Sequence, residues 1–89
     1  MKFHPGTVVI TPGCLQAFES SGDQPLDFLL KHLNLDPGDL SPEDIRENEL
    51  SLKHGWRILS AYRLSDGTRI WLITESDRSS TCLLLPEEY

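Results

Sequence analysis

The chain has 89 residues, of which 38% are hydrophobic and 25% are charged, and its fourteen acidic residues outnumber the eight basic ones to give a net charge of −6. This length leaves room for one hydrophobic core, so we expect a single domain spanning residues 1–89, and the apolar fraction is too high for a disordered chain. The acidic balance disfavours binding to nucleic acid or to anionic lipid, and it favours a protein partner with a basic surface.

Nothing in the sequence predicts a membrane span or a secretion signal. Uninterrupted apolar runs, such as residues 83–85, are far shorter than the about 20 residues that cross a bilayer. Met1 is followed by neither a charged region nor an apolar signal segment. The two cysteines, Cys14 and Cys82, lie far apart and do not suggest a disulfide framework. We therefore expect a cytoplasmic protein that does not associate with membranes.

The N-terminal part predicts a short strand followed by a helix. Residues 7–10 include three consecutive β-branched side chains, which favour a strand. Thr11-Pro12 matches a helix start, because the hydroxyl can cap free backbone amides and proline suits the first helical position. We expect Leu15 and Phe18 to face inward and Gly22 to end the helix.

Two further helices are predicted between residues 25 and 55. In the first of them, four leucines recur at the i, i+3, i+4 and i+7 spacing of an apolar helical stripe: Leu26, Leu29, Leu30 and Leu33. The next helix opens at Ser41, which has an acid three residues later in the pattern of a capping box. We expect Ile45 and Leu52 on its buried face and Gly55 at its end.

From residue 57 onward the pattern predicts strands over residues 57–64, 69–75 and 81–85. The first two are joined through Asp66-Gly67, a strong hairpin signal that leaves two registers open. A two-residue loop would pair Tyr62 with Trp71, whereas a type I turn with Gly67 as a bulge would pair Tyr62 with Ile70. Both strands are apolar on alternate positions of either face, so the sheet could be covered on both sides, with helices on one face.

Together these elements predict an α+β fold, with about three short helices followed by a three-stranded antiparallel β-meander. The strand expected at residues 7–10 could join this meander. No internal repeat and no linker between domains is evident.

A long C-terminal motif resembles a known family. It comprises Ile73-Thr74-Glu75-Ser76-Asp77-Arg78-Ser79-Ser80-Thr81, followed by Leu84-Leu85-Pro86-Glu87-Glu88-Tyr89. These residues resemble a family of small proteins from bacterial plasmids, phages and integrated elements, sometimes labelled restriction-system subunits and without an established function. The chain is too short for the cofactor-binding domain of a methyltransferase. The resemblance therefore implies a mobile-element context, and it transfers no catalytic residues.

The cysteines and histidines give weak signals for chemistry. Cys14 falls near the third residue of the first helix, where exposed amides can lower the pKa of a thiol, although a buried hydrophobic role is the commoner one. Metal binding would require His4, Cys14, His32, His54 and Cys82 to converge, and they lack the paired spacing of zinc sites. We expect no metal and no cofactor, and we place His32 and His54 near helix C-termini, where partial positive charge is favourable.

Two charged clusters are candidate sites for a partner. Glu75, Asp77 and Arg78 crowd into the loop before the last strand, where they could bind a charged group or simply stabilise the turn. The second cluster places six acids within fourteen residues, and we describe it as an acidic ridge: Asp36, Asp39, Glu43, Asp44, Glu47 and Glu49. The ridge could dock a basic surface, or it could be an ordinary solvated helix face.

Aromatic residues offer a further candidate. Trp71 becomes a partner site or a dimer interface if the sheet face that carries it is uncovered. On the nucleic-acid question, Arg57, Arg63 and Arg69 could gather on one strand face in the bulged register.

Our leading hypothesis from the sequence is a non-catalytic interaction protein, accessory or anti-defence, of a mobile genetic element. It would bind its partner through Glu43, Asp44 and Glu47, through the loop of residues 75–78, or through Trp71. The alternatives are a small homodimeric regulatory or structural module and a small enzyme that uses Cys14 or the loop of residues 75–80.

Overall fold

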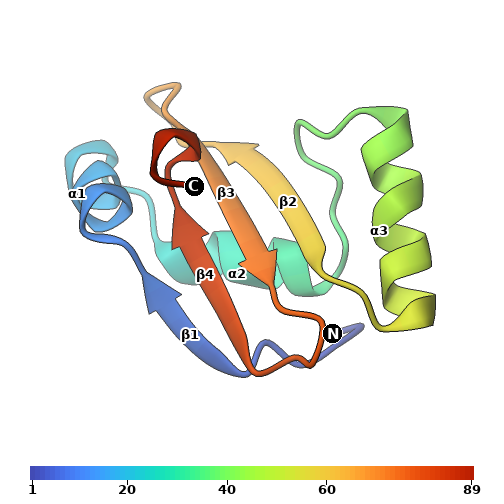
Figure 1. Ribbon diagram of the computed structural model, residues 1–89. Coiled ribbons are helices and arrows are strands. Elements are labelled where there is room, and N and C mark those ends of the chain that lie inside the picture. The colour runs from blue at the N-terminus through green and yellow to red at the C-terminus, as the bar shows by residue number, and fades with distance from the viewer.

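The computed structural model describes all residues, 1–89, and shows an α+β fold with three α-helices and one four-stranded sheet (Figure 1). The elements in chain order are β1 (Thr7–Ile10), α1 (Pro12–Ser21), α2 (Pro25–Leu33), α3 (Pro42–His54), β2 (Ile58–Arg63), β3 (Arg69–Thr74), β4 (Ser80–Leu84) and the 3₁₀ turn η1 (Pro86–Glu88). None of the helices combines the length and the apolar composition that a membrane span requires.

The helix ends lie where the sequence predicts them. The Thr11 hydroxyl accepts a hydrogen bond from the Cys14 N–H at the start of α1, and the Ser41 hydroxyl accepts one from the Asp44 N–H at the start of α3. Gly22 and Gly55 end these two helices in the left-handed conformation, which glycine adopts without a side-chain clash. Local chemistry therefore determines these boundaries.

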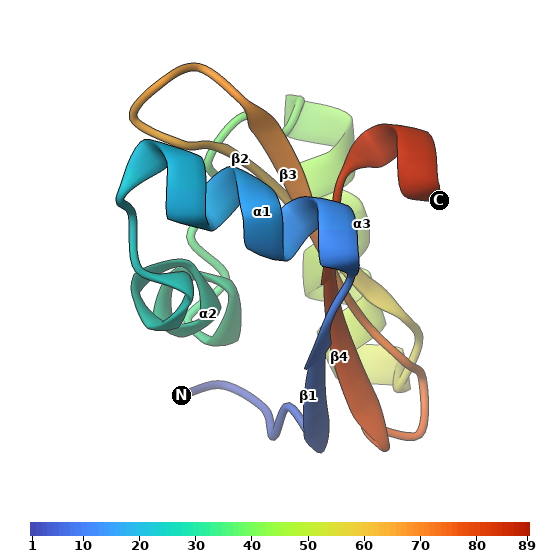
Figure 2. The same cartoon turned by 90° about the vertical axis from the view of Figure 1, so that its left-hand side faces the viewer.

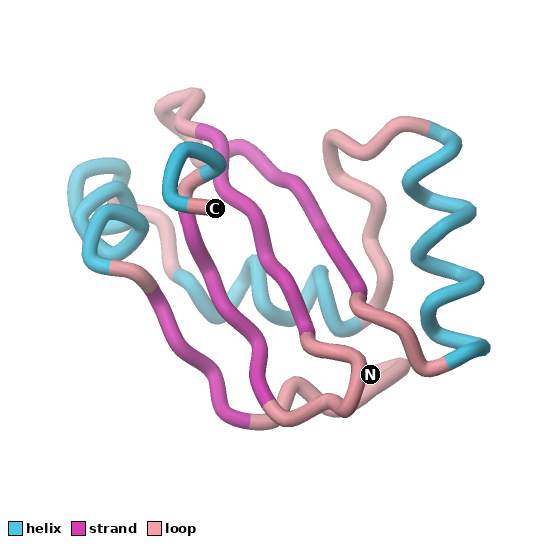
Figure 3. Tube along the Cα trace, in the orientation of Figure 1, coloured by secondary structure: helices cyan, strands magenta, loops and turns pink.

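The sheet has the strand order β1-β4-β3-β2 (Figure 3). The expected antiparallel meander of β2, β3 and β4 is present, and β1 joins it by pairing in parallel with β4, from Thr7 opposite Ser80 to Ile10 opposite Leu83. The sheet is therefore mixed and four-stranded, rather than a three-stranded antiparallel meander alone.

The β2–β3 hairpin adopts the bulged register. Tyr62 pairs with Ile70, because Gly67 takes a positive φ of 89° and its N–H donates to the carbonyl of Leu64. This register sorts alternate side chains to the two faces of the sheet. Tyr62 and Ile70 consequently point to the inner face, toward α1 and α2, and Trp71 points to the outer face.

The main core lies between α1, α2 and the inner face of the sheet (Figure 2). Eight buried residues form it: Cys14, Phe18, Phe28, Tyr62, Leu64, Ile70, Leu72 and Leu83. A smaller cluster joins Phe3, Leu33 and Ile58. The core thus takes residues from both ends of the chain, which holds the N-terminal segment against the meander.

The inward faces of the first two helices differ from the prediction. Phe18 is buried as expected, but Leu15 is exposed, because Cys14 rather than Leu15 faces the sheet. In α2, Leu26 and Leu30 are exposed, and the buried residues are Phe28, His32 and Leu33. The predicted leucine stripe was therefore wrong in part. The helix is rotated so that the Phe28 ring packs against the rings of Phe18 and Tyr62, with centroids 5.7 and 5.8 Å apart.

Helix α3 lies beside the edge of the sheet rather than over either face (Figure 1). Its Asn48 side chain pairs with β2 as a neighbouring strand would, donating to the Leu59 carbonyl at 2.5 Å and accepting from the Leu59 N–H at 3.1 Å. Nearby, the Asp39 N–H donates to the Ala61 carbonyl, and Gly38 forms a bridge with Ala61. The free edge of β2 is therefore closed by side-chain and loop contacts.

The C-terminal segment forms a structural cap on α1. After β4 the chain forms η1, which carries Glu88 to the first turn of α1. The Thr11 hydroxyl donates to the Glu88 carboxylate at 2.5 Å, and the Leu85 N–H donates to the same oxygen at 2.8 Å. Both bonds lower the pKa of Glu88, and the bond from Thr11 has the larger effect. The Glu88 carboxylate thus stabilises the positive end of the α1 dipole.

Candidate functional site

The outer face of the sheet is uncovered over β2 and β3, and it is the face turned toward the viewer in Figure 1. Two hollows lie on it, of about 210 and 270 Å³, and both are lined by Leu59 and Trp71. The first also includes Ala61, and the second includes Ile73 and Tyr89. Because they share two residues, we treat them as one surface and call it the outer groove.

Trp71 forms the centre of the outer groove. Its indole is half-buried, and its ring meets the Tyr89 ring edge-on with centroids 5.6 Å apart. The Arg57 guanidinium lies over the Tyr89 ring at 5.8 Å and donates to the Tyr89 hydroxyl at 3.3 Å. The groove therefore has an apolar floor and an aromatic and cationic border formed by Tyr89 and Arg57.

Three arginines lie on this outer face, as the bulged register predicts. Arg63 and Arg69 stand opposite each other on β2 and β3. Arg63 forms an ion pair with Asp39 at 2.9 Å, and Arg57 lies 3.6 Å from the Glu75 carboxylate. Because two of the three guanidinium groups face carboxylates, this face does not present the uninterrupted positive charge that attracts a phosphate backbone.

The acids of the ridge that belong to α3 lie on two different sides of that helix. Asp44 lines the outer groove together with Asp39. Glu47 and Glu43 follow it around the exposed side of the helix, about 60° and 100° from Asp44 at the helical 100° per residue. All three are exposed. We call Glu43, Asp44 and Glu47 the acidic wall; Asp44 is the member that lines the groove.

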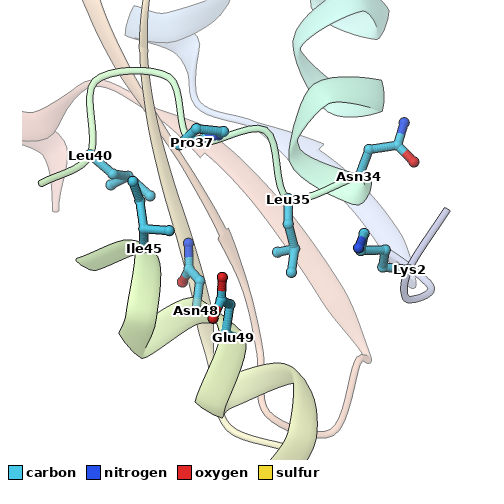
Figure 4. A pocket seen from close by; sticks show the side chains of 8 residues that line it. All are labelled: Lys2, Asn34, Leu35, Pro37, Leu40, Ile45, Asn48 and Glu49. Carbon is cyan, nitrogen blue, oxygen red and sulfur yellow. The ribbon is translucent and has the colours of Figure 1, made fainter. Parts of the chain in front are cut away.

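Glu49 lies on the other side of α3. It lines a separate hollow of about 130 Å³ between α3 and the α2–α3 connection (Figure 4). Lys2, Leu35 and Ile45 line the same hollow, as do Asn34, Pro37, Leu40 and Asn48. Asp36 is engaged in its own loop, where its carboxylate accepts the Gly38 N–H at 3.1 Å. The six acids of the ridge therefore do not act as one surface.

The loop of residues 75–78 is held by its own hydrogen bonds. The Asp77 carboxylate accepts the Ser79 N–H at 2.9 Å, and bonds to Ser79 lower the pKa of Asp77. The Arg78 guanidinium donates to three backbone carbonyls: Ser51, Trp56 and Glu75. Arg78 thus ties the end of α3 to the β3–β4 turn, and its bonding groups are engaged within the protein.

The environment of Cys14 disfavours a nucleophile. The side chain is fully buried in the core, and burial, followed by the nearby Glu88 carboxylate, raises the pKa of its thiol to about 12. The thiol therefore stays protonated near neutral pH, whereas a catalytic cysteine requires the thiolate. The buried-hydrophobe interpretation of Cys14 agrees with this geometry.

His32 is a buried residue whose role the sequence did not reveal. Its Nδ1 lies 2.6 Å from the Ser60 hydroxyl and its Nε2 lies 2.8 Å from the Thr74 hydroxyl. Thr74 is 2.7 Å from the Thr81 hydroxyl, which donates to the Pro5 carbonyl at 2.8 Å. Because a carbonyl only accepts, Thr81 must accept from Thr74, which leaves Thr74 to accept from a protonated Nε2.

This chain of hydrogen bonds places a proton on Nε2 of His32. Burial, and then the charge of Arg78, lower the pKa of His32 to about 4. His32 lies in the last turn of α2 as predicted, but it does not carry the positive charge that the prediction assumed. His4, Cys14, His32, His54 and Cys82 do not gather, and no group of three His, Cys, Asp or Glu side chains could hold a metal ion.

No protein-family model, no curated protein and no solved structure matches the chain. The candidate site therefore depends on its own geometry. Sequence reasoning named Trp71 and the residues of the acidic wall as candidates, and it did not name Leu59, Ala61 or Tyr89, which line the groove with Trp71. The Ala61–Trp71 pairing is implied by the bulged register, so its signal was available once that register was chosen.

Proposed function

We propose that this chain is a non-catalytic interaction protein of a mobile genetic element, which acts in the cytoplasm as an accessory or anti-defence protein. It docks a protein partner on the outer groove and the acidic wall. One observation carries the proposal: an uncovered apolar groove, centred on Trp71, runs along the outer sheet face and is bordered by the carboxylate of Asp44, with Glu43 and Glu47 exposed on the same helix.

The chemistry of the groove defines the partner. Leu59, Ala61 and Trp71 would receive an apolar or aromatic side chain, and large aromatic residues of this kind often contribute about 2 kcal/mol or more at protein interfaces. Glu43, Asp44 and Glu47 would face lysine or arginine side chains on the partner. Such complementarity raises association rates and excludes partners with acidic surfaces.

The cellular setting is supported by the C-terminal resemblance to small plasmid and phage proteins. Within that motif, Asp77 and Arg78 hold a turn and Glu88 caps α1, so these motif residues contribute to folding. The same motif brings Tyr89 to the border of the outer groove. Its residues therefore support both the fold and the proposed surface.

The test is an affinity capture from host lysate, with native mass spectrometry of the bound species. The wild type is compared with Glu43→Lys/Glu47→Lys, which reverses the acidic wall. Glu19→Lys/Glu49→Lys is the matched control, because it changes the net charge equally at exposed positions away from the wall. We expect a stoichiometric partner that the wall variant loses and the control retains.

A second variant tests the groove. Ala61→Arg places a long side chain on the outer face opposite Trp71, at a position whose side chain is not part of the core. It should also abolish capture of the partner, while circular dichroism shows a folded protein. A partner retained by both Ala61→Arg and the wall variant would contradict the proposal.

A second candidate function, a small homodimeric regulatory or structural module, is favoured by the position of β1 at the end of the strand order, where it pairs with β4 alone. Native mass spectrometry of the purified chain addresses it directly.

A further inference from the structure

One edge of the sheet is covered by other parts of the chain and the other edge is not. The edge of β2 is closed by Asn48, which pairs with Leu59, and by the bridge of Gly38 to Ala61. The opposite edge is β1, which pairs only with β4. Figure 2 shows β1 at the near side of the molecule, with no element on its free side. One edge of the sheet is therefore open.

The backbone of β1 presents regular hydrogen-bonding groups at this open edge. The Thr7 N–H donates to the Ser79 carbonyl and the Thr11 N–H donates to the Leu83 carbonyl, so the odd-numbered residues face β4. Because backbone groups alternate along a strand, the N–H and carbonyl groups of Val8 and Ile10 point away from the sheet. These groups are suited to pairing with another strand.

The side chains of β1 include no charge and no proline that would oppose pairing with another strand. Natural edges commonly carry charged residues, proline or a bulge that prevents pairing. Residues 7–10 carry none of these, and the side chains of Val8 and Val9 are 44% and 46% exposed. Leu15 on the adjacent α1 is also exposed. This edge is therefore apolar, whereas the acidic wall lies beside the opposite edge.

We infer that two copies of this chain associate through antiparallel pairing of their β1 strands. A two-fold axis at Val9 places Val8 of each copy opposite Ile10 of the other, and each such pair exchanges N–H···O=C bonds in both directions. A strand that pairs with itself around a two-fold axis is the isologous arrangement of most homodimers. The two sheets become one continuous sheet.

Electrostatics makes the β1 edge the place where a second copy meets the least repulsion. The chain carries a net charge of −6, so association through most of its surface brings like charges together. The β1 edge carries no charge, and the acidic walls of the two copies lie at the outer edges of the combined sheet. Their repulsion is therefore weak, because it falls with distance and is screened by salt.

The size of the contact sets the expected strength. Stable interfaces bury about 1,200 Å² or more in total, and pairing of two four-residue strands provides less than this. We therefore expect a dimer with a dissociation constant in the micromolar range that leaves the outer groove free.

The test is sedimentation velocity of the purified chain over the micromolar range. The mass should rise toward twice the 10.1 kDa of the monomer. Val9→Lys places two lysines opposite each other at the two-fold axis and should shift dimerisation at least tenfold toward monomer. Val9→Thr, which keeps the β-branched shape without a charge, should still dimerise. A monomer at every concentration would overturn the inference.

Hydrogen exchange identifies the surface of any dimer. The amides of Val8 and Ile10 should gain protection as the concentration rises. Val8→Pro removes an outward N–H that makes no bond to β4, and it should also prevent dimerisation. A dimer that persists in Val9→Lys and leaves these amides unprotected would use another surface and refute β1 pairing. Neither result bears on partner capture by the outer groove.

Discussion

Lowering the pH from about 7.5 to about 5 should destabilise this protein through one buried side chain, His32. The pKa of His32 in the folded protein is lowered to about 4, against 6.5 for an exposed histidine. Between these two values the unfolded chain binds a proton that the folded protein does not. The free energy of unfolding therefore falls as the pH falls below about 6.5, and the loss is complete near pH 4.

The magnitude follows from the difference between the two pKa values. They lie about 2.5 apart, and each pKa unit corresponds to about 1.4 kcal/mol, so the full loss is about 3 kcal/mol. About 2 kcal/mol of it is expected by pH 5, where most carboxylates are still ionised. The physical reason is burial, which disfavours the charged imidazolium, and next the positive charge of Arg78. A proton on Nδ1 would also replace the bond that this nitrogen accepts from Ser60.

The assay is urea unfolding followed by circular dichroism at a series of pH values. His32→Gln should lower stability near pH 7.5, because it removes packing and one or both hydrogen bonds, but it should remove most of the pH dependence between about pH 5 and 7. His54→Gln is the matched control, because it removes an exposed imidazole that stacks on Trp56. The control should keep the slope. A slope retained in His32→Gln, or an NMR titration of His32 near pH 6.5 in the folded protein, would refute the reasoning.

Three other substitutions test the contacts that hold the outer groove in place. Arg78 has a positive φ of 59°, a conformation that glycine adopts more easily than alanine. The free energy of unfolding of Arg78→Gly should therefore exceed that of Arg78→Ala by about 1 kcal/mol in a thermal melt. Equal stabilities would show that no backbone strain is stored there. Asn48→Leu leaves the Leu59 N–H and carbonyl without partners and should cost about 2 kcal/mol by urea unfolding, a loss that a neutral result would contradict. Thr11→Val removes the N-cap of α1 at a cost of about 1 kcal/mol, and it should raise the pKa of Glu88 in an NMR titration, because the Thr11 hydroxyl is the main cause of its lowering; an unchanged Glu88 pKa would disprove that contact.

The sequence by itself determined the features that depend on neighbouring residues. Thr11 and Gly22 bound α1, and Ser41 and Gly55 bound α3, because capping needs only a hydroxyl or a flexible glycine within one turn of the helix. The α+β class, the three strands of the meander and the short strand of residues 7–10 follow from composition and alternation in the same way.

The candidate site was predictable only in part. The exposure of Glu43 and Glu47 follows from their position on an amphipathic helix, but the separation of Glu49 from the acidic wall depends on where α3 meets the sheet. The hairpin signal at Asp66-Gly67 allowed two registers that place Trp71 on opposite faces. The bulged register is the one that sends Tyr62 into the core with Phe28 and leaves Trp71 outside.

Only the tertiary structure decided the contacts between distant residues. His32 is buried because Ser60 and Thr74, 28 and 42 residues away, satisfy both of its nitrogens. In the same way β1 finds β4, and Asn48 closes the edge of β2. The local sequence around these residues does not reveal such partners. A buried polar group is stable only where the fold supplies its hydrogen bonds.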